Sequence, residues 1–301
     1  MDYSEVVARY FAPRPDGTPV PDAVRLGSPA RRLRDAVEPI AMHAAWSRRT
    51  IDSLARLGLD ASASYVAGRA SSLGEPSGLV VAATFAWFEP SLIASLYESS
   101  RAIVPREQLI VARDEATTGS LWEILGNDDP TEFADLVAEA VTSASGAGRS
   151  LFSGLRGRGR PADPAQRLWW ACDLVREHRG DSHVAAASAA GVGPVEMNVL
   201  TELWLGMPLL SYTSTRGWDA TEMAATVASL EARGWLADGQ LTQAGRSARV
   251  EVEDRTDAQE QTIVDALGPR FENVCAQLNS WSARCVLAGA FPPDVLKRAA
   301  G

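Results

Sequence analysis

The sequence predicts an all-α, mainly helical protein with one or two short β-hairpins. Alanine-rich stretches place apolar residues three or four positions apart, which is the spacing of one helix face. Runs of β-branched residues bounded by turn residues are nearly absent, so strands should be few. With 301 residues and 46% hydrophobic composition, the chain can bury one large core or two modest ones.

Composition changes along the chain predict five segments. Residues 1–27 contain several prolines and are expected to form an irregular lead-in. Residues 151–164, rich in Gly and Arg, are expected to link two helical domains at 28–150 and 165–250. The remaining residues, 251–301, are expected to add helices at the C-terminus.

An internal match suggests that the two domains arose by duplication. Residues 30–43 align with 165–178, and residues 65–92 align with 183–210 without a gap. These 42 aligned positions contain eleven identities, where this composition would give roughly four by chance. We therefore expect two halves of similar architecture.

The second half defines the expected order of elements. Asp181, Ser182 and Asp219 are good N-caps, Pro194 suits a first helical turn, and Gly180 suits a helix end. The predicted elements are helices at 165–178, from 181 or 182, from 194 and at 219–233, a hairpin turning at Asp238-Gly239, and helices at 243–267 and 270–288. This order is the layout of a winged helix, so we expect two winged-helix-like halves.

Two stretches carry a family resemblance. The run LEARGWLADGQLTQAGR (230–246) resembles the recognition-helix and wing segment of MarR-type regulators. REHRGDSHVAAASAAG (176–191), with its REHRGDxH motif, SYVAGRASSLG (64–74) and TFAWFEP (84–90) resemble an actinobacterial helix-turn-helix family of about 300 residues. The resemblance covers residues 30–257 and implies a winged-helix fold, but it implies no particular activity.

The charge of the chain argues against nucleic acid as a partner. The formal net charge is -9 and the pI is about 5.0, which makes contact with phosphates unfavourable unless basic residues share one face. The candidate recognition helix 219–233 offers three acids and one Arg, and the wing 237–240 has no base. Only dimerisation together with the basic loop 156–160 would build a DNA-binding surface.

Other patterns bear on location and assembly. No segment is a signal peptide or an uninterrupted apolar span, so we expect no membrane contact. Three cysteines without metal-ligand spacing are typical of buried thiols in a reducing cytoplasm. An apolar stripe, Val274, Leu278, Trp281 and Cys285, either packs on the core or forms a homodimer.

The three histidines indicate a candidate catalytic or ligand-binding site. His178 lies on an apolar helix face, His43 occupies the matching position of the first half, and His183 is expected in the first turn of the following helix, where the helix dipole disfavours imidazolium. With Arg179 and Asp181 beside them, His178 and His183 would act as acid or base, Asp181 would orient the imidazole, and Arg179 would anchor an anion.

Residues of the first half complete this predicted site. Tyr65 aligns with His183, and Arg69 follows one helical turn later. Together with His43, Trp87 and Phe88, they would line a tryptophan-rich cleft that binds a ligand between the halves. The alternatives are that the histidines are hydrogen-bonded core residues, or that they bind a metal or haem; no cofactor is required by the sequence.

No phosphate loop, nucleophile elbow, H-E-x-x-H or dinucleotide fingerprint is present. The leading hypothesis is a small-molecule-binding protein, an enzyme of actinobacterial specialised (antibiotic) metabolism that acts by acid–base chemistry on a small aromatic or carboxylate-bearing substrate. The alternatives are a ligand-responsive MarR-like regulator and a protein that sequesters a ligand for self-resistance. The sequence alone leaves all three open.

Overall fold

The computed structural model describes residues 1–14, 20 and 27–300. Helices dominate the described chain, and the described strands form one two-stranded sheet, so the all-α prediction is confirmed. The elements are α1 (Tyr3–Tyr10), α3 (Pro29–Ala41), α4 (His43–Trp46), α5 (Arg48–Ala55), α6 (Ala61–Ala70), η1 (Ser71–Leu73), α7 (Gly78–Phe85), α8 (Pro90–Ile103), α9 (Arg106–Leu125), α10 (Thr131–Thr142), α11 (Ser150–Gly157), α12 (Pro164–Ala189), α13 (Pro194–Trp204), η2 (Thr213–Arg216), α14 (Ala220–Ala232), β1 (Leu236–Ala237), β2 (Gln240–Leu241), α15 (Gln243–Leu267), η3 (Gly268–Arg270), α16 (Phe271–Leu287) and α17 (Val295–Ala300).

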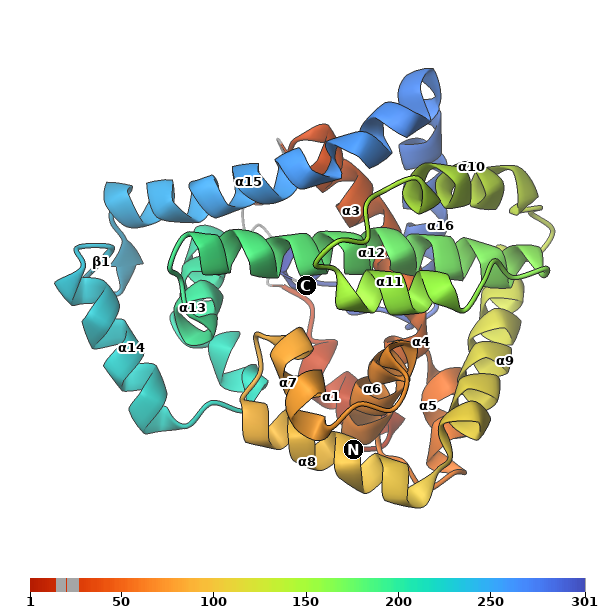
Figure 1. Ribbon diagram of the computed structural model, residues 1–301, viewed down its shortest axis with the longest axis horizontal. Helices are drawn as coiled ribbons and strands as arrows, with labels where there is room; N and C mark the ends of the chain where they lie inside the picture. Colours follow the sequence, from red (N-terminus) through yellow and green to blue (C-terminus); the bar gives the residue numbers. More distant parts are fainter. Residues whose placement is uncertain (15–19, 21–26, 301) are drawn as a thin grey trace.

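The long helix α12 forms the centre of the molecule. It begins with Pro164 in its first turn, and the N-cap Asp163 accepts a hydrogen bond from the backbone N–H of Gln166. It packs against α3, α10, α11 and α15, and Figure 1 shows it crossing the middle of the molecule beside α15. The main hydrophobic core combines residues from α3 and α12 with residues from α16, so both sides of the predicted domain boundary contribute to one core.

The predicted helix end at Gly180 is wrong, because α12 continues through this residue to Ala189. A glycine inside a helix costs roughly 1 kcal/mol relative to alanine. The stabilisation from contacts between α12 and α15 outweighs this cost. On both sides of Gly180, His178 and Ser182 contact Glu260, and Arg179 pairs with Asp257. Tertiary contacts therefore override the local signal for a break.

The winged-helix layout of the second half is present. Asp219 caps α14, and Thr242 caps α15. β1 and β2 pair antiparallel, with Leu236 opposite Leu241 and a turn at Asp238-Gly239. Both turn residues have positive φ, as a two-residue hairpin of this type requires. The apolar sides of α13, α14, β1 and α15 meet in a separate small core. Figure 1 shows this unit at one end of α12 and the helices α5 and α9 toward the other.

Two segments expected to be irregular contain helices. In the lead-in, residues 3–10 form α1, because Asp2 and Glu5 make a capping box and Val6 is buried. Within that lead-in, residues 15–19 and 21–26 lie outside the described residues. In the expected linker 151–164, the first residues belong to α11, whose Leu151, Phe152 and Leu155 are buried. Their apolar face favours packing over a solvated linker despite the glycines around them.

The C-terminal helices agree closely with expectation. α15 ends at Leu267 and α16 spans Phe271–Leu287. The apolar stripe of α16 packs into the main core, so it is not a free dimer surface. All three cysteines are free and buried. Among the residues that the structure describes, no helix combines the length and apolar character needed to cross a bilayer.

Candidate functional site

His178 is buried among structural partners. Its Nδ1 lies 2.7 Å from Oε1 of Glu260, and Ser182 Oγ donates to the same carboxylate oxygen at 2.9 Å. The ring of Phe152 meets the imidazole edge-on, with 4.9 Å between the ring centroids. These contacts tie α12 to α15 and α11.

His183 lies in the interior of α12 rather than in a first turn, so the expected effect of a helix dipole on it is wrong. Its Nδ1 lies 3.1 Å from Thr256 Oγ1, and its ring packs on Trp87 with 5.3 Å between centroids. The pKa of His183 is lowered to about 3, chiefly by burial and then by the nearby positive charge of Arg249. His183 is therefore neutral at physiological pH, for a different physical reason than the sequence suggested.

His43 is also fully buried, at the start of α4. Neither ring nitrogen has a hydrogen-bond partner in the part of the chain that the structure describes. Burial alone lowers its pKa to about 3. The ring does not join the other two histidines, and across residues 1–14, 20 and 27–300 no group of three or more His, Cys, Asp or Glu side chains is arranged to hold a metal ion.

Arg179 and Asp181 point to different neighbours. Arg179 pairs with Glu253 and Asp257 of α15, each at 2.6 Å. Asp181 accepts a hydrogen bond of 3.1 Å from the backbone N–H of Phe152 and so caps α11 from outside that helix. Burial, followed by the charge of Glu177, raises the pKa of Asp181 to about 6. The residues nominated around His178 are thus distributed around α12 instead of facing one cleft.

The nominated residues of the first half form two groups. Trp87 packs on His183, and its carbonyl accepts hydrogen bonds from Asn198 and Trp218. Tyr65 contacts the ring of Phe88. Arg69 reaches α12 and makes a bidentate ion pair with Glu177, with two N–O distances of 2.7 Å.

A small cavity of about 40 Å³ opens beside this ion pair. It lies between α4, α6 and α12, with one residue each from the end of α3 and from α9. Tyr65 and Arg69 are the nominated residues on its wall. The lining residues are Ala41, Met42, Ala44, Ala45, Ser64, Tyr65, Gly68, Arg69, Arg113, Trp169, Asp173, Arg176 and Glu177. We call this space the Asp173 cavity.

The three guanidinium groups of the Asp173 cavity already have partners. Arg69 and Arg176 both pair with Glu177. Arg113 pairs with Asp114 at 2.9 Å and lies over the ring of Trp169. These guanidinium charges are compensated by carboxylates of the protein. The arginines therefore affect the electrostatic potential in the cavity, but they offer few free groups to bind a ligand.

Asp173 differs from its neighbours. It is partly exposed to the cavity, and it makes no hydrogen bond or ion pair with any residue that the structure describes. Burial and the charge of Glu177, one helical turn away, raise its pKa to about 7, although Arg176, Arg113 and Arg69 act in the opposite direction. A carboxyl group that titrates near neutral pH beside a cavity is a candidate for ligand binding or proton transfer.

Sequence reasoning missed Asp173, Arg113 and Arg176. The available signal was the i, i+4 repetition of acids at Asp173 and Glu177 on one helix, which places like charges side by side. No sequence pattern indicated that Arg113 belongs to this cavity. Arg113 lies on α9, which is far from α12 in the sequence and approaches it only in the folded protein. None of the three histidines lines the Asp173 cavity.

The winged-helix unit presents an exposed face on α14 that carries acidic side chains. Leu230 is the one buried residue of α14, and Glu222 and Glu231 are exposed. Arg233, which follows α14, pairs with Glu196 at 2.9 Å and lies over the ring of Trp235. This face therefore offers little free positive charge to a phosphate backbone.

Taken together, the order of α13, α14, the hairpin and α15 defines a helix-turn-helix protein of the winged type. The chain belongs to a helix-turn-helix family, whose family model matches residues 30–292. No curated protein and no solved structure matches it.

Proposed function

We propose that this helix-turn-helix protein binds a small molecule at the Asp173 cavity and exchanges a proton with it through Asp173. The observation that supports the proposal most directly is the state of this one carboxyl group. It has no hydrogen-bond or ion-pair partner among the described residues, it borders a cavity, and its pKa is raised to about 7. Polar groups without partners in such places usually serve a ligand or a proton transfer.

The cavity chemistry favours a ligand that carries a hydrogen-bond donor, such as an amine or a hydroxyl group. The guanidinium groups are already paired, whereas Asp173 can accept a hydrogen bond when ionised and donate one when neutral. About 40 Å³ accommodates only a few ligand atoms. We therefore place the rest of the ligand at the mouth of the cavity, beside the partly exposed Met42 and Tyr65.

The proposal includes general acid–base catalysis as the activity that such a carboxyl group supports, because a catalytic pKa near the working pH is the most effective. We include in the proposal the role in specialised metabolism, including antibiotic biosynthesis, that the sequence analysis put forward. The three buried free thiols are compatible with a cytoplasmic setting, which we include in the proposal.

The test compares wild type with Asp173→Asn, both purified from the native host and measured by native mass spectrometry. We expect a bound small molecule in wild type and its loss in the variant, because losing one charge-assisted hydrogen bond weakens binding about tenfold or more. Asp265→Asn, a change at an exposed acid of α15, serves as the matched control and should retain the ligand. A clean apo mass for wild type, or the same adduct in Asp173→Asn, would contradict the proposal.

A second candidate function is regulation of transcription in response to a ligand. The specific observation that favours it is the winged-helix unit, with α14 exposed at the end of the molecule. The acidic residues on α14 argue against this regulatory function, because they repel DNA phosphates. The DNA-binding measurement described in the Discussion separates the two candidates.

A further inference from the structure

A second, much larger hollow has none of the nominated site residues in its lining. This groove has a volume of about 840 Å³ and is formed by α5, α9 and the end of α16. Its lining residues are Ser47, Arg48, Arg49, Asp52, Arg56, Ser120, Glu123, Ile124, Arg284, Leu287, Ala288 and Ala290. It shares no lining residue with the Asp173 cavity. We call it the α5 groove.

The α5 groove is locally basic although the whole chain is acidic. Four arginines and two carboxylates line it, whereas the chain has a formal net charge of -9. Arg56 has no ion-pair partner among the described residues. Because the protein elsewhere repels anions, this excess of guanidinium groups would concentrate an anionic ligand here.

The ion pairs inside the groove leave its arginines available. Arg48 pairs with Asp52 at 3.4 Å, and their side chains are 74% and 49% exposed. Arg49 pairs with Glu123, again with both side chains well exposed. Exposed pairs of this kind contribute little to stability, so a ligand anion can replace either carboxylate at little cost.

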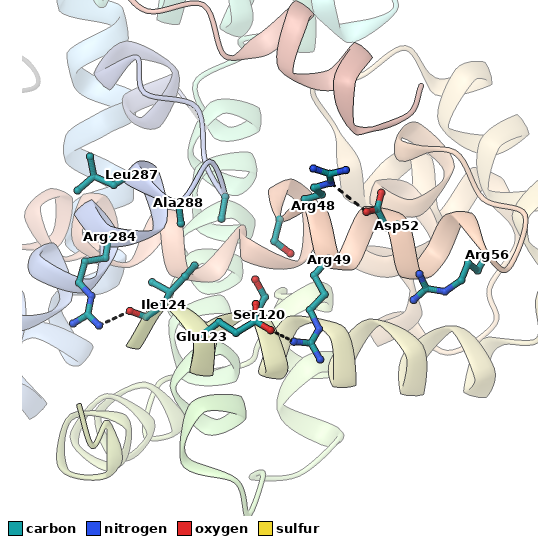
Figure 2. A pocket seen from close by; sticks show the side chains of 12 residues that line it. Arg48, Arg49, Asp52, Arg56, Ser120, Glu123, Ile124, Arg284, Leu287 and Ala288 are labelled. Atoms are coloured by element: carbon teal, nitrogen blue, oxygen red, sulfur yellow. Dashed lines mark hydrogen bonds and ion pairs between the residues drawn. The ribbon is translucent and has the colours of Figure 1, made fainter. Parts of the chain in front are cut away.

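The two ends of the groove differ in polarity. Figure 2 shows the side chains of Arg48, Arg49 and Arg56 following one another along α5, while Leu287 and Ala288 lie at the other end. Arg284 lies beside them, but its guanidinium group already donates to the Ile124 carbonyl and pairs with Asp128. Leu287 is 86% exposed, more than any other large apolar side chain in the described part of the chain. One end can therefore hold an anionic group, and the other can cover an apolar body.

We propose that the α5 groove binds a small organic anion with an apolar body, such as a carboxylate or phosphate ester of a short hydrocarbon. The anionic group pairs with Arg49 and Arg56, and the hydrocarbon lies against Leu287 and Ile124. The volume is within the range of small-molecule sites, about 300–1,000 Å³. Guanidinium groups suit both carboxylate and phosphate because each accepts paired N–H donors.

The proposal is tested by isothermal titration with decanoate, decyl phosphate and the neutral decyl glucoside. We expect saturable binding of at least one anion with a Kd below about 1 mM and none of the neutral compound. Arg56→Ala should weaken anion binding about tenfold, as for a lost charge-assisted hydrogen bond. Leu287→Ser should weaken it about fivefold or more by removing apolar contact.

Matched controls separate this site from general effects. Arg246→Ala removes an exposed arginine of α15 that has no ion pair within the described chain, and Asp173→Asn alters the other cavity; neither should change the anion Kd. Arg56 and Leu287 are exposed, so both variants should fold. Absence of saturable anion binding, equal binding of decyl glucoside, or unchanged affinity in both groove variants would overturn the proposal. Binding of decyl phosphate but not decanoate would identify a phosphate ester, and the reverse would identify a carboxylate.

Discussion

At the scale of residues, the three histidines illustrate how burial decides chemistry. All three are in or near the core, but each has a different set of partners. His178 has the carboxylate of Glu260, His183 has the hydroxyl of Thr256, and His43 has no hydrogen-bond partner among the described residues. An imidazole without a partner in the core must remain neutral, because a buried charge would have no compensation. The contribution of His43 to stability should therefore depend strongly on pH.

His43→Leu should make the protein less sensitive to acid. The folded-state pKa of His43 is lowered from 6.5 to about 3. Between these values the unfolded chain binds a proton that the folded chain cannot, so stability falls as pH decreases through this window. The variant removes this loss, and its free energy of unfolding relative to wild type should rise by on the order of 1 kcal/mol per pH unit between about pH 6 and 4. Urea denaturation at several pH values measures it, with pH 7.5 as the reference; parallel curves for the two proteins would contradict it.

At the scale of elements, α12 shows that tertiary contacts can keep a helix continuous where the local sequence predicts that it ends. Gly180 lies in a charged, partly polar stretch that is typical of a helix end. The ion pairs from α12 to α15 and to Arg69 keep the backbone helical across it. A Cβ atom at Gly180 would lie 3.8 Å from Glu177 Oε2 and 3.9 Å from Arg69 Nη2, which is ordinary contact.

Gly180→Ala should accordingly stabilise the protein by about 0.5–1 kcal/mol, because alanine loses less backbone entropy in a helix. Gly154→Ala in α11 is the matched contrast. Its Cβ would come within 2.2 Å of the Ser72 carbonyl oxygen, so that variant should be destabilised. Guanidinium denaturation measures the free energy of unfolding of both variants against wild type. A clear loss of stability in Gly180→Ala would mean that α12 is interrupted in solution.

At the scale of the whole molecule, charge is distributed unevenly. Many of the basic side chains are paired with acids in buried networks. One such network joins Glu253 to Arg31, Arg179 and Arg249. Four arginines and two carboxylates line the α5 groove, while the exposed face of α14 carries acids. A winged helix with this distribution lacks the phosphate contacts that supply most non-specific DNA affinity.

We therefore expect negligible binding to random duplex DNA at roughly 150 mM salt, measured by fluorescence anisotropy. A double variant, Glu222→Lys with Glu231→Lys, replaces two exposed acids of α14 and should gain salt-dependent binding if charge is the cause. Sub-micromolar binding by the wild type would refute the charge argument and favour the transcription regulator.

The sequence by itself determined the fold class, the order of elements from Pro194 onward and the bounds of α15 and α16. These features depend on local signals: N-caps at Asp219 and Thr242, the Asp238-Gly239 turn and helical apolar spacing. Only the tertiary structure decided that α12 is continuous, that the nominated histidines face different neighbours, and that Asp173, Arg69 and Arg113 share a cavity. The physical reason is that caps and turns act within a few residues, whereas burial, ion pairing and cavities arise between helices far apart in the chain.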